Sequence, residues 1–415
     1  MTVWSPNKIL DDPDKFGYYL VGDFKTYSKV EAIEVSKKSK ISPIWHYNDE
    51  IFDQQDWTKE PDVDLWELYK LRAQQIRSNY DYVVLWYSGG SDSHNMLSAW
   101  IEAGCKIDEI ASTWNYEADA DRQSFCNAEI NNVVLPDIEK LKNQGLDFKF
   151  RLVDISNYCI DIVKTFGLNF EYYVNYHGSV NNPAKALIRE KVDDYKDLIA
   201  SGKRLCFVWG LEKPRVSFDQ NGYYYAFIDT VDNCISPYVQ ENCREGWYDE
   251  LFYISPNFPL LPIKSAHVIK NFLDQCDNKE YFDSVLPLHA HSKKFNRSLK
   301  IEMVKTVLYP KWNNNIFCNG KASSMLFSRR DEWFLNSNLN EIKMYNGMIK
   351  ELVKILGKDW IHFKTKNKTG NLWSDIKYDG QRSESFSYSS NIRFDKSSVT
   401  HNRFYGAVTI RGLDS

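Results

Sequence analysis

Residues 88–93 read Ser-Gly-Gly-Ser-Asp-Ser and directly follow the apolar run 82–87. Glycine has no side chain to block a ligand, and it tolerates positive φ. If a helix begins in this stretch, its first main-chain N–H groups lack partners within the helix and, with the helix dipole, favour an anion. The serine hydroxyls add further donors. The stretch therefore predicts a loop that holds phosphate.

Asp92 indicates which type of phosphate-binding loop this stretch forms. The stretch contains neither the Gly-x-x-x-x-Gly-Lys of a Walker loop nor the Gly-x-Gly-x-x-Gly of a dinucleotide loop. A carboxylate beside a phosphate is repulsive unless a divalent cation lies between them, and Mg²⁺ is bound in proteins through carboxylate and phosphate oxygens. Asp92 therefore predicts a bridging Mg²⁺. An ordinary strand-to-helix turn without a ligand is the structural alternative.

Alternating strands and helices must position this loop. The expected strands are residues 82–87, 107–114, 148–154 and 204–210. The expected helices are residues 92–103, 123–143, 156–166 and 184–201, the second of them kinked or split at Pro136. Strands separated by helices predict an α/β fold with a doubly wound parallel sheet. The nearly continuous apolar run 82–87 is typical of a strand buried on both faces.

The strand expected over 204–210 ends at Gly210, and two cations, Lys213 and Arg215, follow it. Ligands of open α/β sheets lie beyond the carboxyl ends of the strands, near the switch in strand order. If this strand lies beside residues 82–87, both cations face the phosphates and offset the charge that develops there. A solvated Lys-Pro-Arg turn is the alternative.

Four segments are expected along the 415 residues. Residues 1–57 form a strand-rich leader with a strand at 18–24 and a helix at 28–40. Residues 58–240 form the sheet domain, which begins with a helix at 58–79 capped by Thr58. Residues 241–363 form a mainly helical capping region, with a helix from about residue 264. Residues 364–415 form a polar tail or lid.

Composition limits the function classes. A formal net charge of −4 argues against a general nucleic-acid binder, although a local basic groove stays open. Eight cysteines without a Cys-x-x-Cys pair argue against zinc ribbons and thioredoxin-type redox pairs. No apolar run reaches membrane-spanning length, and the first residues lack a secretory profile. We expect a soluble cytoplasmic protein, with its oligomeric state left open.

Residues 88–93 match the SGGxDS signature of the PP-loop (N-type) ATP pyrophosphatases, and the flanking strand and helix match as well. The resemblance covers about residues 80–230. It implies the HUP fold, also called adenine nucleotide alpha hydrolase-like, with ATP and Mg²⁺ as cofactors. Such enzymes cleave ATP between its α and β phosphates and join AMP to a substrate oxygen. A nucleophile, usually nitrogen or sulfur, then displaces AMP.

The resemblance and the residue patterns together assign roles. The expected catalytic residues are Asp92, Lys213 and Arg215, and Asp92 is also the expected metal ligand. The expected nucleotide-binding residues are Ser88, Gly89, Gly90, Ser91, Asp92, Ser93, Ser112, Thr113, Trp114 and Gly210. By analogy with PP-loop folds, the three residues at 112–114 end the second strand near the adenine and ribose. His94, one turn into the helix, lies either near the phosphates or on the helix surface.

Several substrates fit this chemistry. The chain begins Met-Thr, without the N-terminal cysteine of glutaminase domains, so glutamine hydrolysis is not expected. Residues 252–273 and 307–312 resemble asparagine-synthase-like PP-loop proteins of phage genomes. The leading hypothesis is an AMP-forming ligase that uses a nitrogen nucleophile on a small molecule. The alternatives are an enzyme that modifies a nucleobase of tRNA, DNA or a free deazapurine, and an inactive ATP-binding module. A sulfonucleotide reductase is disfavoured because no cysteine lies near the C-terminus.

Overall fold

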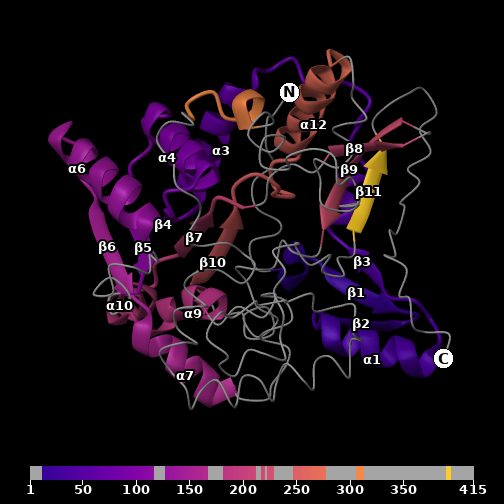
Figure 1. Ribbon diagram of the computed structural model, residues 1–415, viewed down its shortest axis with the longest axis horizontal. Helices are drawn as coiled ribbons and strands as arrows, with labels where there is room; N and C mark the ends of the chain where they lie inside the picture. Colours follow the sequence, from indigo (N-terminus) through magenta and orange to yellow (C-terminus); the bar gives the residue numbers. More distant parts are fainter. Residues whose placement is uncertain are drawn as a thin grey trace, which may run out of the picture.

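Five parallel strands form the central sheet of the structure, a computed structural model that describes residues 12–115, 127–166, 181–211, 216–219, 222–228, 246–276, 305–312 and 389–393 (Figure 1). In chain order these strands are β4 (Tyr82–Trp86), β5 (Glu109–Trp114), β6 (Lys149–Asp154), β7 (Leu205–Trp209) and β10 (Trp247–Leu251). Their order across the sheet is β10-β7-β4-β5-β6. The expected α/β class with a parallel sheet is confirmed, and the four strands expected from the sequence are all present.

The fifth strand, β10, extends the sheet beyond residue 240, into the segment expected to be mainly helical. It pairs in parallel with β7, from Trp247 opposite Leu205 to Leu251 opposite Trp209. Its sequence, Trp-Tyr-Asp-Glu-Leu, places two carboxylates in the middle of a buried strand. Such a run does not read as a core strand, because buried carboxylates require partners that the local sequence does not reveal.

Those two carboxylates show that helices cover both faces of the sheet. Successive side chains of a strand point to opposite faces. Asp249 pairs with Arg189 on one side, and Glu250 pairs with Arg72 on the other. Figure 1 shows the same arrangement, with α3, α4 and α6 on one side of the sheet and α7, α9 and α10 on the other.

The first face is covered by α3 (Leu65–Asn79), α4 (Ser91–Glu102), the π-helical η2 (Ile130–Val134) and α6 (Leu135–Asn143). The expectation that Thr58 caps the first of these helices is wrong. Its hydroxyl instead bonds Asp56, and the helix begins at Leu65, where the Asp64 carboxylate accepts from the Trp66 N–H at 2.7 Å. Pro61 disfavours a helix that runs through Glu60, because the residue before a proline avoids the helical region, and the Asp64 cap sets the start at Leu65.

Pro136 occupies the first turn of α6, where its missing N–H costs no helical bond. The helix changes from π to α type at this point, so the expected irregularity at Pro136 is confirmed.

On the second face, α7 (Ser156–Phe166) has the expected bounds. The helix expected over 184–201 is instead three pieces: α9 (Asn181–Leu187), η3 (Ile188–Lys191) and α10 (Asp193–Ala200). The chain is extended at Val192, which separates the last two pieces. The short η3 directs the Arg189 guanidinium to Asp249, a partner 60 residues away that helical periodicity does not reveal.

The leader contains η1 (Pro13–Phe16), β1 (Tyr18–Val21), β2 (Phe24–Thr26), α1 (Lys29–Ser39), β3 (Ile44–His46) and α2 (Asp49–Phe52). The single strand expected over 18–24 is a hairpin, because Gly22 has a φ of 62° and turns the chain between β1 and β2. With β3, the hairpin forms a three-stranded sheet of order β2-β1-β3. The leader packs on a further three-stranded sheet through Phe227, whose ring centroid is 5.0 Å from that of Tyr47 and 4.5 Å from that of Phe52.

That sheet consists of β8 (Val216–Asp219), β9 (Gly222–Ile228) and β11 (Ser389–Arg393), in the order β11-β9-β8. β11 is the described part of the expected tail 364–415. The remaining helix, α12 (Leu260–Asp274), packs near α3 and begins slightly before the expected residue 264 (Figure 1). Among the described residues, no helix has the length and apolar character needed to cross a membrane.

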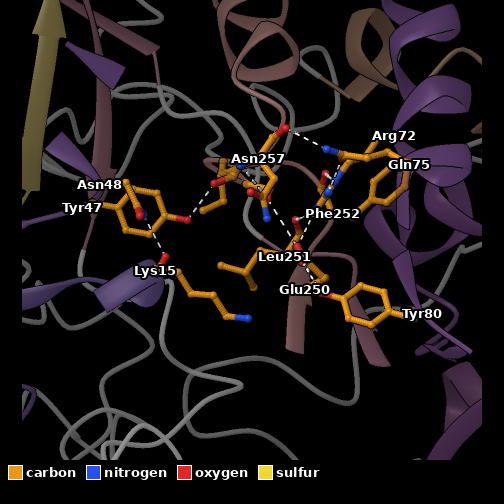
Figure 2. A network of polar contacts seen from close by, with 12 residues as sticks. Lys15, Tyr47, Asn48, Arg72, Gln75, Tyr80, Glu250, Leu251, Phe252 and Asn257 are labelled. Atoms are coloured by element: carbon orange, nitrogen blue, oxygen red, sulfur yellow. Dashed lines mark hydrogen bonds and ion pairs between the residues drawn. The ribbon is translucent and has the colours of Figure 1, made fainter. Parts of the chain in front are cut away.

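A buried polar network joins α3 to β10 and the residues after it (Figure 2). Arg72 is fully buried, and its guanidinium contacts Glu250 at 2.6 Å and the Leu251 carbonyl at 3.0 Å. Gln75 accepts from Arg72 at 2.6 Å and donates to the Asn257 carbonyl at 2.8 Å. The network fixes the sheet edge against the helix that precedes the loop-bearing strand.

Candidate functional site

The loop 88–93 lies at the switch in strand order of the central sheet. β4 lies between β7 and β5, and it pairs in parallel with both. The chain leaves β4 toward β5 on one side and later returns through β7 on the other, so the loop after β4 opens at the crevice between them. The sequence analysis required the strand before Lys213 and Arg215 to lie beside residues 82–87. That strand is β7, and its position beside β4 is confirmed.

Glycine is required at position 89. Its φ is 73°, in the region that disfavours other residues, and a Cβ there would lie 3.0 Å from Val134 Cγ2 and 3.1 Å from the Glu129 carbonyl. The loop thus packs tightly on the π-helical turn η2. A tight turn that rests on a helix leaves its outer main-chain groups for a ligand.

The N-terminus of α4 is not capped by a side chain within the described part of the chain. Gly90 occupies the cap position with extended φ and ψ and offers no side chain. By contrast, Ser28 caps α1 and Asp64 caps α3. An uncapped N-terminus of a 12-residue helix at the sheet switch point keeps N–H groups and the positive dipole end for an anion.

The three serines of the loop divide into one exposed and two buried side chains. Ser93 is buried, and its hydroxyl accepts from the Ser88 N–H at 3.2 Å and donates to the Gly90 carbonyl at 3.1 Å. Ser93 thereby closes the loop on itself. Ser91 is also buried, whereas Ser88 is exposed. Ser88 is therefore the hydroxyl best able to meet a ligand from solvent.

Gly210 lies directly against the first turn of α4. A Cβ at this glycine would be 3.0 Å from both the main-chain nitrogen and the Cα of Ser93. The end of β7 and the start of α4 therefore approach as closely as two main chains permit. The role expected for Gly210 at the nucleotide is compatible with this place, and close backbone contact is the reason that glycine occupies it.

Asp92 is held by two tyrosines from distant segments. Its Oδ1 accepts from the Tyr309 hydroxyl at 2.5 Å, and its main-chain carbonyl accepts from the Tyr253 hydroxyl at 2.6 Å. Burial, and then the negative charge of Asp92, raise the pKa of Tyr309 well above its ordinary value, so this phenol stays a donor. Tyr253 and Tyr309 fall in segments 252–273 and 307–312, which were noted in the sequence, but their approach to Asp92 was not foreseen because they lie 161 and 217 positions from it.

His94 lies in a polar cluster beneath the loop. Its Nδ1 is 3.1 Å from the Tyr87 hydroxyl and 3.3 Å from Asp137 Oδ2, and the Tyr87 hydroxyl also bonds Asp137. Burial acts to raise the pKa of Asp137, but hydrogen bonds from His94 and Tyr87 hold it below its ordinary value. The cluster ties α4 to α6, and this internal partnership is the observed role of His94.

The residues at the end of β5, 112–114, are buried or half-buried. Ser112 is buried, and its hydroxyl donates to the Tyr87 carbonyl at 2.5 Å, so it supports the strand end just before the loop. Thr113 is also buried, and Trp114 is half-buried. Their contact with a nucleotide stays a prediction.

Three asparagines that the sequence analysis missed gather immediately after β5. Asn115 exchanges hydrogen bonds with Asn127 through its main chain, at 3.1 and 2.8 Å, and its amide donates to Asn181 at 3.2 Å. Within the described structure the Asn115 Oδ1 is buried without a hydrogen-bond partner. In the sequence only Asn115 is marked, by its place directly after a strand; Asn127 and Asn181 lie 12 and 66 positions farther along the chain.

Lys213 and Arg215 lie outside the described residues, so their expected roles stay predictions. Among the described residues, no three His, Cys, Asp or Glu side chains come together as a metal cage. The donors near the loop are nevertheless suited to Mg²⁺, because they are oxygens: the Asp92 carboxylate and the Ser88 hydroxyl. Mg²⁺ commonly takes one or two carboxylates and completes its shell with phosphates and water.

No family model, curated protein or solved structure matches the chain.

Replacing Gly89 with alanine is expected to destabilise the protein, because it adds both backbone strain and a clash with η2. Gly104→Ala is the matched control: Gly104 also has positive φ, of 65°, but nothing lies within 4 Å of its Cβ position. Urea denaturation should show Gly89→Ala about 1–3 kcal/mol less stable than Gly104→Ala, the usual cost of overpacking. Equal losses would mean that the loop does not pack tightly on η2.

Proposed function

We propose that this protein is an AMP-forming ATP pyrophosphatase of the PP-loop type, built on a HUP-like sheet, and that it activates a substrate oxygen for displacement by a nitrogen nucleophile. The observation that carries the proposal is the position of residues 88–93. They join a buried parallel strand to an uncapped helix at the switch in strand order, where open α/β sheets bind ligands.

Each group of residues near the loop has its own role in this proposal. The main-chain N–H groups at the start of α4 and the exposed Ser88 hydroxyl hold the β and γ phosphates. Asp92 holds Mg²⁺, which when bound neutralises charge on the phosphate oxygens. Lys213 and Arg215, which follow β7 in the sequence, offset charge at the α-phosphate and the departing pyrophosphate.

Two bond exchanges complete the reaction. A carboxylate or carbonyl oxygen of the substrate attacks the α-phosphorus, the α–β phosphoanhydride bond breaks, and pyrophosphate leaves with the electron pair. The nitrogen nucleophile then attacks the activated carbon, and AMP leaves with the former substrate oxygen. Rigid placement of the loop by Gly89, Ser93 and Gly210 keeps the α-phosphorus aligned for this displacement.

The bond-cleavage assignment is tested with ATP labelled at the α or the γ phosphate. Protein, Mg²⁺ and a panel of carboxylic acids, amides and nucleobases with ammonia should yield α-labelled AMP and γ-labelled pyrophosphate. An ¹⁸O-labelled acceptor should transfer its label to AMP. ADP with inorganic phosphate would contradict the proposal. ATP binding without pyrophosphate release across the panel would favour the binding-only alternative.

A further inference from the structure

The segment 305–312 lies against α3 and α4 and is held there by several contacts. The Tyr69 hydroxyl of α3 donates to the Leu308 carbonyl at 3.1 Å. Lys311 lies 2.9 Å from Glu102 at the far end of α4, and the Trp312 ring meets His94 edge-on at 5.7 Å. In Figure 1 the orange segment lies beside these two helices. The segment is therefore fixed relative to the candidate site.

Within this segment Tyr309 is the residue that reaches the loop. Its side chain is buried, with 1% of its surface exposed, and its hydroxyl donates to Asp92 Oδ1 at 2.5 Å. A carboxylate can accept about four hydrogen bonds or metal contacts over its two oxygens. The bond from Tyr309 therefore orients the carboxylate without exhausting its capacity to bind a cation.

The main chain of Asp92 is fixed by a separate bond. The Tyr253 hydroxyl donates to the Asp92 carbonyl at 2.6 Å and accepts from the Asn95 amide at 3.1 Å. Two phenols thus hold one acidic residue, one at its carboxylate and the other at its backbone.

We infer that Tyr309 is a positioning residue for the metal of this site: its hydroxyl fixes the Asp92 carboxylate in the orientation in which it takes the Mg²⁺ of a bound nucleotide. The inference rests on the proposed function. Partners that orient a ligand carboxylate in this way change metal affinity about 10- to 100-fold when they are removed. The distant C-terminal half of the chain thereby becomes part of the nucleotide site.

The test measures Mn²⁺ binding, in place of Mg²⁺, by electron paramagnetic resonance with the full chain and α,β-methylene-ATP. Tyr309→Phe keeps the ring and removes only the hydroxyl, and it is expected to weaken Mn²⁺ binding about 10- to 100-fold. Nucleotide affinity without metal should stay within about twofold, since the phosphate-binding main chain is unchanged. Tyr253→Phe, which removes an equally buried hydroxyl from the Asp92 backbone, should cause a clearly smaller loss.

The outcomes separate this inference from the proposed function. Wild-type affinity for Mn²⁺ in Tyr309→Phe, or equal losses in the two variants, overturns the positioning role while the proposed function stands. Absence of Mn²⁺–nucleotide binding in the wild type overturns the proposed function, and the inference falls with it. A second measurement avoids dependence on a folded variant: Tb³⁺ bound to the wild-type complex should luminesce with a tyrosine excitation band, and absence of that band contradicts the inference.

Discussion

Asp92→Asn is expected to lower kcat/KM for pyrophosphate release at least about 1,000-fold. Stabilisation of phosphate charge by a bound metal is worth several kcal/mol, and each 1.36 kcal/mol changes a rate tenfold. Asparagine keeps an Oδ1 that can accept from Tyr309, so the substitution removes the negative charge and leaves the shape and the hydrogen bond in place. Steady-state kinetics with labelled ATP, over a range of Mg²⁺ concentrations, measures the loss.

Asp81→Asn is the matched control for this experiment. Asp81 immediately precedes β4, at the opposite edge of the sheet from the loop, and its exposed carboxylate pairs with Arg204. The kcat/KM of Asp81→Asn should match that of the wild type within about twofold, because an exposed ion pair contributes little to stability and this one lies far from the loop. If Asp92→Asn retained wild-type kcat/KM and its Mg²⁺ dependence, Asp92 would not be the metal ligand.

The largest effect on stability is expected from Arg72→Met, because it leaves the Glu250 carboxylate charged and buried without its cation. Arg72 and Glu250 are 0% and 4% exposed at their side chains, and their atoms are 2.6 Å apart. Removal of one partner of such a pair costs about 3–5 kcal/mol. That is a large fraction of the about 5–15 kcal/mol by which proteins are usually stable. Urea denaturation followed by circular dichroism measures the change.

Arg204→Met serves as the control, since the Arg204–Asp81 pair is 44% and 43% exposed. Its removal should cost less than about 1 kcal/mol. Equal losses for Arg72→Met and Arg204→Met would mean that the buried network does not stabilise the sheet edge.

The same network predicts a pH dependence with a definite sign. In the wild type, burial acts to raise the pKa of Glu250, but Arg72 and Lys15 hold it below its ordinary value of 4.5. Its contribution to stability is therefore full above that pH and is lost as the pH falls below it. In Arg72→Met the pKa should rise above the ordinary value, so the difference between variant and wild type should shrink on acidification. A difference that grows toward acid pH would contradict this account.

Local sequence patterns predicted β4 and β7 because these strands carry almost only apolar side chains and are buried at nearly every position. The helix 156–166 was predicted with correct bounds for a similar reason, since one face of it is apolar throughout. β10 was missed because two carboxylates interrupt it, and their burial becomes understandable only with Arg72 and Arg189 beside them. The break at Val192, where the backbone is extended, has no signal in the helical periodicity of residues 184–201.

In the candidate site, too, local features were predictable from the sequence and distant contacts were not. Its loop was recognisable in the sequence because six consecutive residues, a preceding strand and a following helix are all local features. The segments 252–273 and 307–312, which contain Tyr253 and Tyr309, were noted in the sequence, but nothing in them pointed to Asp92. The asparagines were not recognisable, because asparagine is frequent and their partners lie far apart in the sequence.

The amino-acid order by itself determined that a glycine- and serine-rich turn with one carboxylate would stand between a buried strand and a helix, since backbone freedom and apolar periodicity act over a few residues. Only the tertiary structure decided that this turn lies beside the end of β7, with Tyr309 bonded to its carboxylate. Such contacts join residues more than one hundred positions apart, and they depend on how the layers pack around the sheet.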